Sequence, residues 1–414
     1  MKIADKVSKN RIENQIKTLA QIGATGEGGI TRLPYTKDER AAVALVKSYM
    51  EEAGLQTFFD QFGNLFGKLE GKSTEAPVVM TGSHVDTVIN GGAFDGVIGT
   101  LGAIEALRVI RENNIPHVHT LEACVFVSEE PVRFRAGTLG SKAAIGDFTQ
   151  SDLDRLKDKD NISLAQAIKE CGFNPEQLES VRRDPAKIKC FVELHIEQSI
   201  ILETKKLPIG VVDQIAAPTN FRLTLKGKAG HAGATPMNMR NDAFMAAAEI
   251  ALEIERIAIT IGKEAVGTVG EVKVIPNAIN VIPGEVILGI DVRDVTSKRK
   301  DEAIAEIEKS INNIAARRNI EAVIEIIQKQ EPVKTSPQIV DIISSTCNEL
   351  GLPWCNITSG AYHDALNMAK ITDIGMIFIP SAGGISHAKE EFSSIDDIYQ
   401  GARVLAEVLV KLAS

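Results

Sequence analysis

The feature that most constrains the fold is a series of short, wholly apolar segments that alternate with helical patterns. The segments "APVVMTGSH", "TLEACVFVSEE" and "KCFVELHIEQ" are strand-like, and "GTLGAIEALRVIREN", between the first two, has helical spacing. Strands that are apolar on both faces occur in sheets covered on both faces, and such sheets are mostly parallel. We therefore predict an α/β domain built around a mostly parallel sheet.

The pattern changes in the middle of the chain. From about Pro218, "NFRLTLKGKAG" alternates with period two, and the predicted order becomes strand, helix, two strands, helix and strand. This order is typical of a two-layer α+β domain of the ferredoxin-like kind. The helix and strand patterns of the first part resume after about Pro332. We predict one domain made of residues 1–216 and 332–414, with a smaller domain, residues 217–331, inserted in it.

Composition excludes several classes of partner. The net charge of −9, with no basic stripe, argues against nucleic acid. The chain has no run of 18 apolar residues and its N-terminus lacks the apolar stretch of a signal peptide, so we expect a cytoplasmic protein without a membrane span. The odd number of cysteines and the lack of a C-x-x-C pair argue against a disulfide framework and a thiolate zinc site.

One glycine-rich segment, "GSHVDTVINGGAFDG", carries several polar side chains. His84 and Asp86 are two residues apart at a strand end, so both side chains point to one side of the sheet. This spacing lets Asp86 orient the imidazole and fix its tautomer, as at a metal-bound histidine. The glycines let the backbone fold back, so that Asp95 can approach the same point. Taken alone, the motif fits a structural His–Asp pair equally well.

Further candidates follow other predicted strands. Glu129 and Glu130 end a buried strand, where two carboxylates repel each other unless positive charge lies between them. Ligands of open α/β sheets bind beyond the carboxyl ends of the strands. His84, Glu129 and His195 would meet there, and His387 would arrive on a glycine loop from the C-terminal segment. This mixture of imidazoles and carboxylates is the one expected for a pair of first-row divalent ions.

The ordered set of motifs resembles the N-carbamoyl-L-amino-acid hydrolase and allantoate amidohydrolase group of the aminoacylase/carboxypeptidase-like dinuclear metallohydrolases. The resemblance covers nearly the whole chain. It rests on "GSHVDTVINGGAFDG", "VSEE", "ELHIEQ", "GKAGHAGATPM", "NAINVIPGEV" and "GGISHA".

The resemblance implies a role for each metal-site candidate. Asp95 would bridge two divalent ions, with His84 and His195 completing one site and Glu130 and His387 the other. Glu129 would be the general base, and Asp86 would support catalysis from beside His84. Zinc is favoured, and manganese, cobalt and nickel accept the same donors.

The resemblance also implies substrate contacts and a second subunit. His231 would reach into the partner subunit's site and stabilise the oxyanion, and the inserted domain would act as a lid and carry dimerisation. Alternation along "LGIDVRD" turns Arg293 away from the core of the inserted domain, where its guanidinium could bind an α-carboxylate. His363 is equally compatible with a structural role. The other candidates for substrate contact are Gln198, Asn280 and Gly360.

The expected reaction is hydrolysis of the carbamoyl C–N bond of N-carbamoyl-L-amino acids by a metal-activated water. One alternative is allantoate, another ureido acid, and a second is an aminopeptidase or N-deacylase with the same metals. A non-catalytic binding protein is the third, and the complete ligand set with Glu129 argues against it. The expected partners are a small carboxylate-bearing ureido or amide substrate and a second copy of the chain.

Overall fold

The protein is described here by a computed structural model that covers residues 2–262 and 264–414. The chain packs into two compact units. The first contains the residues up to Asp213 together with Lys334–Ile357 and His363–Ser414, and the second contains Gln214–Val333 and Thr358–Tyr362. The short segment Thr358–Tyr362 thus belongs with the second unit, whereas the predicted boundaries assign it to the first.

The first unit is built on a sheet with a parallel centre. Among the described residues, nine strands form this sheet in the order β1-β2-β4-β3-β5-β15-β6-β13, with β14 paired to β6. Neighbouring β4, β3, β5 and β15 run parallel, whereas β1 pairs antiparallel with β2, β2 with β4, and β6 with β15. The predicted mostly parallel sheet is confirmed. The strands are β1 (Gln56–Phe59), β2 (Leu65–Leu69), β3 (Val78–His84), β4 (Leu121–Phe126), β5 (Ile188–Ile196), β6 (Ile209–Ile215), β13 (Val333–Lys334), β14 (Trp354–Ser359) and β15 (Asp373–Ile379).

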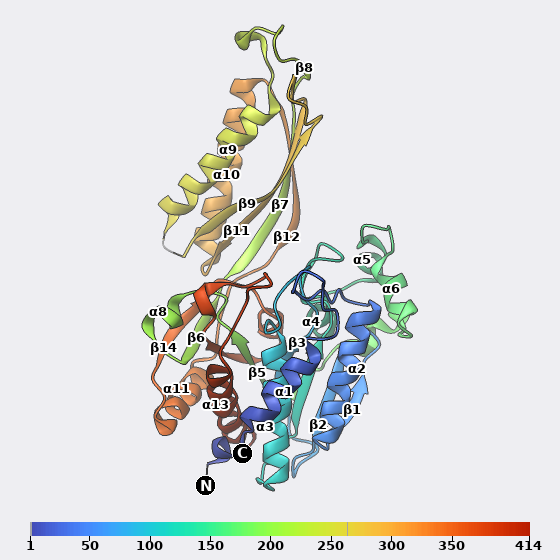
Figure 1. The fold of residues 1–414 in the computed structure, drawn as a ribbon, viewed down its shortest axis with the longest axis vertical. Helices are drawn as coiled ribbons and strands as arrows, with labels where there is room; N and C mark the ends of the chain where they lie inside the picture. Colours follow the sequence, from blue (N-terminus) through green and yellow to red (C-terminus); the bar gives the residue numbers. More distant parts are fainter. Residues whose placement is uncertain (1, 263) are drawn as a thin grey trace. The chain divides into compact units, whose positions relative to one another are not determined.

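The core of the first unit lies between this sheet and its helices. Helices α3 and α13, far apart in sequence, lie side by side (Figure 1) and bury Leu101, Ile104 and Leu405 against the sheet residues Val79 and Leu194. A helix that is apolar on nearly all sides, as α3 is, belongs in such an interior. The helices are α1 (Lys9–Leu19), α2 (Lys37–Glu52), α3 (Val97–Glu112), α4 (Leu139–Ile145), α5 (Gln150–Arg155), α6 (Leu164–Glu170), α7 (Leu178–Val181), α8 (Ile201–Lys205), α11 (Pro337–Leu350), α12 (Asp364–Met368) and α13 (Ile395–Ala413).

The second unit is a two-layer α+β structure. Its antiparallel sheet has the order β12-β7-β11-β9, and α9 and α10 pack together on one face of it (Figure 1). Burial alternates strictly along β11, so every second residue faces the helices. The predicted ferredoxin-like element order is confirmed. The elements are β7 (Ala217–Lys226), β8 (Gly230–His231), α9 (Ala243–Ile261), β9 (Val266–Ile275), β10 (Val281–Ile282), β11 (Glu285–Asp294), α10 (Ser297–Arg318) and β12 (Glu321–Lys329).

Two further features are the lengths of the apolar helices and the state of the cysteines. No helix within the described ranges is both long and apolar enough to cross a bilayer. The cysteines are all free thiols. Burial raises the pKa of Cys190 and of Cys347 to about 12, so these two thiols are inert near neutral pH.

Candidate metal centre

The candidate donors lie at the carboxyl ends of neighbouring parallel strands. His84 is the last residue of β3, His195 lies next to the end of β5, and Glu129 and Glu130 follow β4. Because β3, β4 and β5 run in the same direction, their carboxyl ends meet at one edge of the sheet. The expected convergence of these strand ends is present in the structure.

The first donor group consists of His84, Asp95 and His195, all buried. Oδ1 of Asp95 lies 3.1 Å from Nε2 of His195 and 3.5 Å from Nε2 of His84. Each imidazole contacts a backbone carbonyl through Nδ1, His84 that of Asp86 at 3.0 Å and His195 that of Ile196 at 2.9 Å. With the proton held on Nδ1, each Nε2 keeps its lone pair toward Asp95.

The second donor group consists of Asp95, Glu130 and His387. Nε2 of His387 lies 3.3 Å from Oδ2 of Asp95 and 3.3 Å from Oε1 of Glu130. His387 is the exposed member of this group, whereas the two carboxylates are buried. Asp95 therefore presents one oxygen to each group.

Gly96 makes room for this arrangement. Its φ of +65° lies in the left-handed region that favours glycine. A Cβ at this position would come within 2.5 Å of the His84 ring. The glycine next to Asp95 thus allows the loop to turn back tightly onto the imidazole, as the sequence motif indicates.

Asp86 acts on its neighbours differently from the sequence-based expectation. Its backbone carbonyl, rather than its carboxylate, holds Nδ1 of His84, and Oδ1 lies 3.7 Å from that nitrogen. The carboxylate instead accepts the backbone N–H of Glu129 at 3.2 Å and that of Glu130 at 3.0 Å. Asp86 therefore connects the end of β3 to the segment that follows β4, through two charge-assisted hydrogen bonds.

The centre concentrates negative charge in a buried place. Burial raises the pKa of Glu129 well above its usual range, and the neighbouring Glu130 raises it further. Burial, together with Asp95, raises the pKa of Glu130 to about 7. The pKa of His387 rises to about 9 because its ring is hydrogen-bonded to Asp95. Buried carboxylates with raised pKa values are stabilised by added positive charge, so the electrostatics of this centre favour cations.

The donor chemistry fits transition metals. Imidazole nitrogens and carboxylate oxygens, without a thiolate, suit Zn²⁺, Mn²⁺, Co²⁺ and Ni²⁺. The oxygens of Asp95 separate the two donor groups, so the residues present fit a pair of divalent ions. Glu129 belongs to neither group, although its Oε2 lies 3.8 Å from Nε2 of His84.

Sequence reasoning missed Glu193, which lies behind the first donor group. Glu193, His195 and His363 form a third cluster of buried ligand atoms, and the His195 and His363 ring centroids are 4.5 Å apart. Glu193 accepts the Ser83 hydroxyl at 2.7 Å and the Ala365 N–H at 3.2 Å. Both of its carboxylate oxygens thus accept hydrogen bonds from protein groups, so we assign Glu193 a structural role beside His195. Its position two residues before His195 on one strand was the available signal.

The side chain of Gln198 contacts two members of the second donor group, Asp95 and His387. Its Nε2 donates to Oδ2 of Asp95 at 2.7 Å and lies 3.5 Å from Nε2 of His387. Gln198 has a φ of +58°, a conformation that is uncommon for a residue with a Cβ. Such strain is often found at functional sites.

His231 and Asn280 lie together in the second unit. The strands β8 and β10 pair His231 with Val281, and the carbonyl of Asn280 accepts the N–H of Ala232 at 3.0 Å. Nδ1 of His231 accepts the N–H groups of Gly233 and Ala234, both at 3.1 Å. The exposed His231 ring therefore carries its proton on Nε2, which is available to donate.

Arg293 and Gly360 form a second cluster in this unit. Arg293 points away from the core, as predicted, and donates two hydrogen bonds to Asp291, each of 2.9 Å. Its Nη1 donates to the carbonyl of Gly360 at 3.1 Å, and the guanidinium lies over the Tyr362 ring. The two-pronged face expected to bind a substrate carboxylate is thus occupied by Asp291, because residues two apart on a strand share a face.

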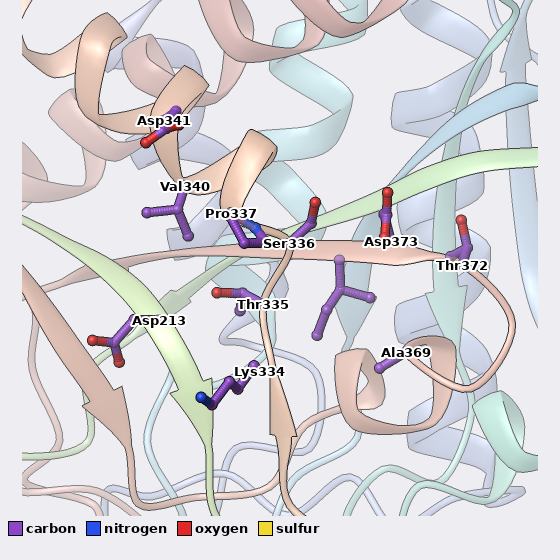
Figure 2. A pocket seen from close by; sticks show the side chains of 11 residues that line it. Asp213, Lys334, Thr335, Ser336, Pro337, Val340, Asp341, Ala369, Thr372 and Asp373 are labelled. Atoms are coloured by element: carbon purple, nitrogen blue, oxygen red, sulfur yellow. The ribbon is translucent and has the colours of Figure 1, made fainter.

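A separate cavity of about 500 Å³ lies in the first unit (Figure 2). Asp373, the first residue of β15, and Pro337, the first residue of α11, contribute to its lining. It therefore lies at the amino ends of the parallel strands, whereas the donor groups lie at their carboxyl ends. None of its lining residues belongs to the candidate centre: Asp213, Lys334, Thr335, Ser336, Pro337, Val340, Asp341, Ala369, Thr372, Asp373 and Ile374.

Known proteins with similar sequences and structures include amidohydrolases. The chain is 40% identical to an N-carbamoyl-L-amino-acid amidohydrolase of Pseudomonas sp. (strain NS671) and 38% identical to an allantoate amidohydrolase of Bacillus subtilis (strain 168), over 98% of both chains in each case. A solved structure described as AtUAH in complex with glyoxylate matches with a TM-score of 0.92 and 38% identity, covering 99% of each chain. These matches confirm the resemblance inferred from the motifs.

The profile of a metal-dependent hydrolase family matches residues 80–411, which span both units and all the candidate donors. Together with the full-length relatives, this match fixes the family. The chain belongs to Peptidase family M20/M25/M40.

Proposed function

We propose that the protein is a metal-dependent amidohydrolase that cleaves the carbamoyl C–N bond of N-carbamoyl-L-amino acids. The observation that carries the proposal is the pair of donor groups joined by Asp95, with Glu129 beside them. The reaction class is that of the 40% identical amidohydrolase. The free thiols support a reducing compartment, and we place the reaction in the cytoplasm.

In this proposal, His84 and His195 would hold one divalent ion, Glu130 and His387 would hold the other, and Asp95 would be shared by both. Zinc is favoured, and manganese, cobalt or nickel would fit the same donors. When bound, such ions supply Lewis acidity, which lowers the pKa of a water ligand to about 7.

Glu129 would be the general base. It is buried, and it lies close to the donor groups without belonging to either of them. Beside two cations a carboxylate is ionised, so Glu129 can take a proton from the attacking water at its carboxylate oxygen. It can then pass this proton to the leaving nitrogen, which completes general acid–base catalysis.

The remaining candidates would bind the substrate. Gln198 and His363 lie against the donor groups, and their side chains would orient the ureido end. Arg293, with Gly360, would bind the carboxylate end of the substrate. Because Asp291 now occupies the guanidinium, this binding requires Arg293 to exchange an intramolecular carboxylate for that of the substrate.

Two copies of the chain would complete each site. His231 lies beyond the start of β11, whereas Arg293 is near the end of that strand (Figure 1). At about 3.3 Å per residue, Arg293 lies roughly 26 Å from Glu285 at the strand start. A small substrate cannot touch both residues of one chain, so His231 and Asn280 would act in the partner subunit of a homodimer. The proposal includes a lid role for the second unit.

Ammonia release tests the reaction. Purified protein would be assayed with N-carbamoyl-L-amino acids, allantoate and a dipeptide, with chelator and after addition of Zn²⁺ or Mn²⁺. We expect chelator-sensitive release from the carbamoyl compounds. The 38% identity to an allantoate amidohydrolase makes allantoate the second candidate, and release from allantoate alone would replace the first. Cleavage of the dipeptide without ammonia from any ureido compound would contradict both and indicate a peptidase or deacylase.

A further inference from the structure

Glu391 lies between the two loops that carry Asp95 and His387, and it is not one of the proposed metal ligands. Its side chain is 4% exposed. Oε1 accepts the backbone N–H of Phe94 at 3.2 Å and that of Asp95 at 3.0 Å. A residue near the end of the chain thus holds the backbone of a loop near its beginning.

The second oxygen of Glu391 holds the loop of His387. Oε2 accepts the Ser386 hydroxyl at 2.9 Å and the backbone N–H of His387 at 3.4 Å. His387 has a φ of +57°, which is unfavourable for a residue with a Cβ and persists only where surrounding contacts support it. The Glu391 carboxylate is one such contact.

Gly92 shows how closely the first loop packs on this carboxylate. A Cβ at Gly92 would come within 2.4 Å of both Cβ and Oε1 of Glu391. A real Cβ cannot come so close, so an alanine here would displace the glutamate side chain or the loop. The close packing against Glu391 therefore requires glycine at position 92.

We propose that Glu391 is a positioning residue that fixes Asp95 and His387 relative to each other and thereby sets the affinity of the cation position that they share with Glu130. The inference rests on the proposed metal-dependent function. Hydrogen bonds from N–H groups to an ionised acceptor are stronger than neutral ones, so one buried carboxylate can hold both loops. Glu391 acts through two of the proposed ligands and is not itself a member of either donor group.

Metal titration of the full-length protein tests the inference. Calorimetry with Mn²⁺ alone, on protein freed of metal with a chelator, would compare the wild type with Glu391→Gln and Glu390→Gln. Glu390 is the exposed neighbour, so the control removes the same charge without the contacts. We expect Glu391→Gln to weaken the second equivalent by about 10- to 100-fold, as is usual when a partner of a metal ligand is lost. Glu390→Gln should bind as the wild type does.

Gly92→Ala is a second, independent variant, since it keeps the glutamate and its charge but displaces them. It should weaken the same equivalent, with thermal unfolding of the metal-free protein as the check on folding. Wild-type affinity in both Glu391→Gln and Gly92→Ala would overturn the inference. A wild-type isotherm without a second equivalent would overturn it together with the two-ion centre. Binding of two equivalents, weakened by Glu391→Gln, in a protein that hydrolyses no ureido compound would support the inference and overturn only the reaction.

Discussion

The carboxylate of Asp86 accepts the backbone N–H of Glu130 at 3.0 Å. Its other oxygen accepts the N–H of Glu129 at 3.2 Å, and its own carbonyl receives Nδ1 of His84. One residue therefore positions an imidazole through its backbone and two catalytic candidates through its side chain. The geometry at the end of β4 depends on Asp86 as much as the geometry at the end of β3 does.

Asp86→Asn should lower turnover with little change in fold. The amide supplies only one accepting oxygen, and its NH₂ group would face a backbone N–H of Glu129 or Glu130. We expect kcat to fall by about 10- to 100-fold, the usual effect of losing a partner of a metal ligand. Steady-state assays with metal analysis would measure this. Asp160→Asn, at an exposed site, is the control, and an unchanged kcat in Asp86→Asn would contradict the assigned role.

Glu129→Gln and Glu130→Gln should separate proton transfer from metal binding. The first variant cannot accept a proton, so we expect kcat to fall by about 10²- to 10⁴-fold while the metal content stays unchanged. The second variant replaces a member of the Asp95 and His387 group, so it should lose the second equivalent of metal. Elemental analysis after gel filtration distinguishes the two results. Loss of metal in Glu129→Gln would make that residue a ligand instead of the base.

The regular parts of this architecture were predictable because they follow from periodicity. Apolar runs without alternation indicate the parallel strands, and the polarity of parallel strands places His84, Glu129 and His195 at one edge of the sheet. The period-two pattern around Arg293 correctly turns its side chain away from the core. These inferences need only local sequence and the geometry of strands.

The contacts that sequence could not supply are those between loops and those with two possible acceptors. Glu391 binds the backbone of Asp95 from 296 positions away, and no periodicity links two irregular segments. Asp86 offers both a carbonyl and a carboxylate, and spacing alone does not tell which of them meets His84. The Asp291–Arg293 pair is different. Residues two apart on one strand share a face, so this contact could have been predicted from the sequence.

Metal affinity at the second donor group should rise with pH. A cation competes with protons for its ligands, so affinity increases as these ligands lose their protons. The pKa of Glu130 is about 7, raised by burial, and that of His387 is about 9, raised by its hydrogen bond to Asp95. Affinity should therefore climb steeply up to about pH 7, less steeply from there to about pH 9, and then level off.

Mn²⁺ calorimetry between pH 6 and 9.5 would measure this profile, and His387→Ala provides the control. Removing the imidazole removes a member of the second donor group, so this variant should bind one equivalent of Mn²⁺ and lose the second, pH-dependent one. A wild-type affinity that does not change over the whole range would contradict the participation of both residues.

Mixing two inactive variants tests whether His231 acts across a dimer. Under the proposal, each site uses Arg293 of its own chain and His231 of the partner, so His231→Ala and Arg293→Ala are each inactive as homodimers. In a mixed dimer, the His231→Ala chain keeps its arginine and receives a histidine from its partner, which restores one of the two sites. If subunits exchange at random in a two-fold dimer, activity should recover to about one quarter of the wild type. His231→Ala mixed with the double variant has no complete site and should stay inactive. If the first mixture fails to recover although tagged subunits show exchange, His231 does not complete the partner's site. Because the length of β11 separates Arg293 from the end of the sheet where His231 lies, only one of the two residues would then contact the substrate.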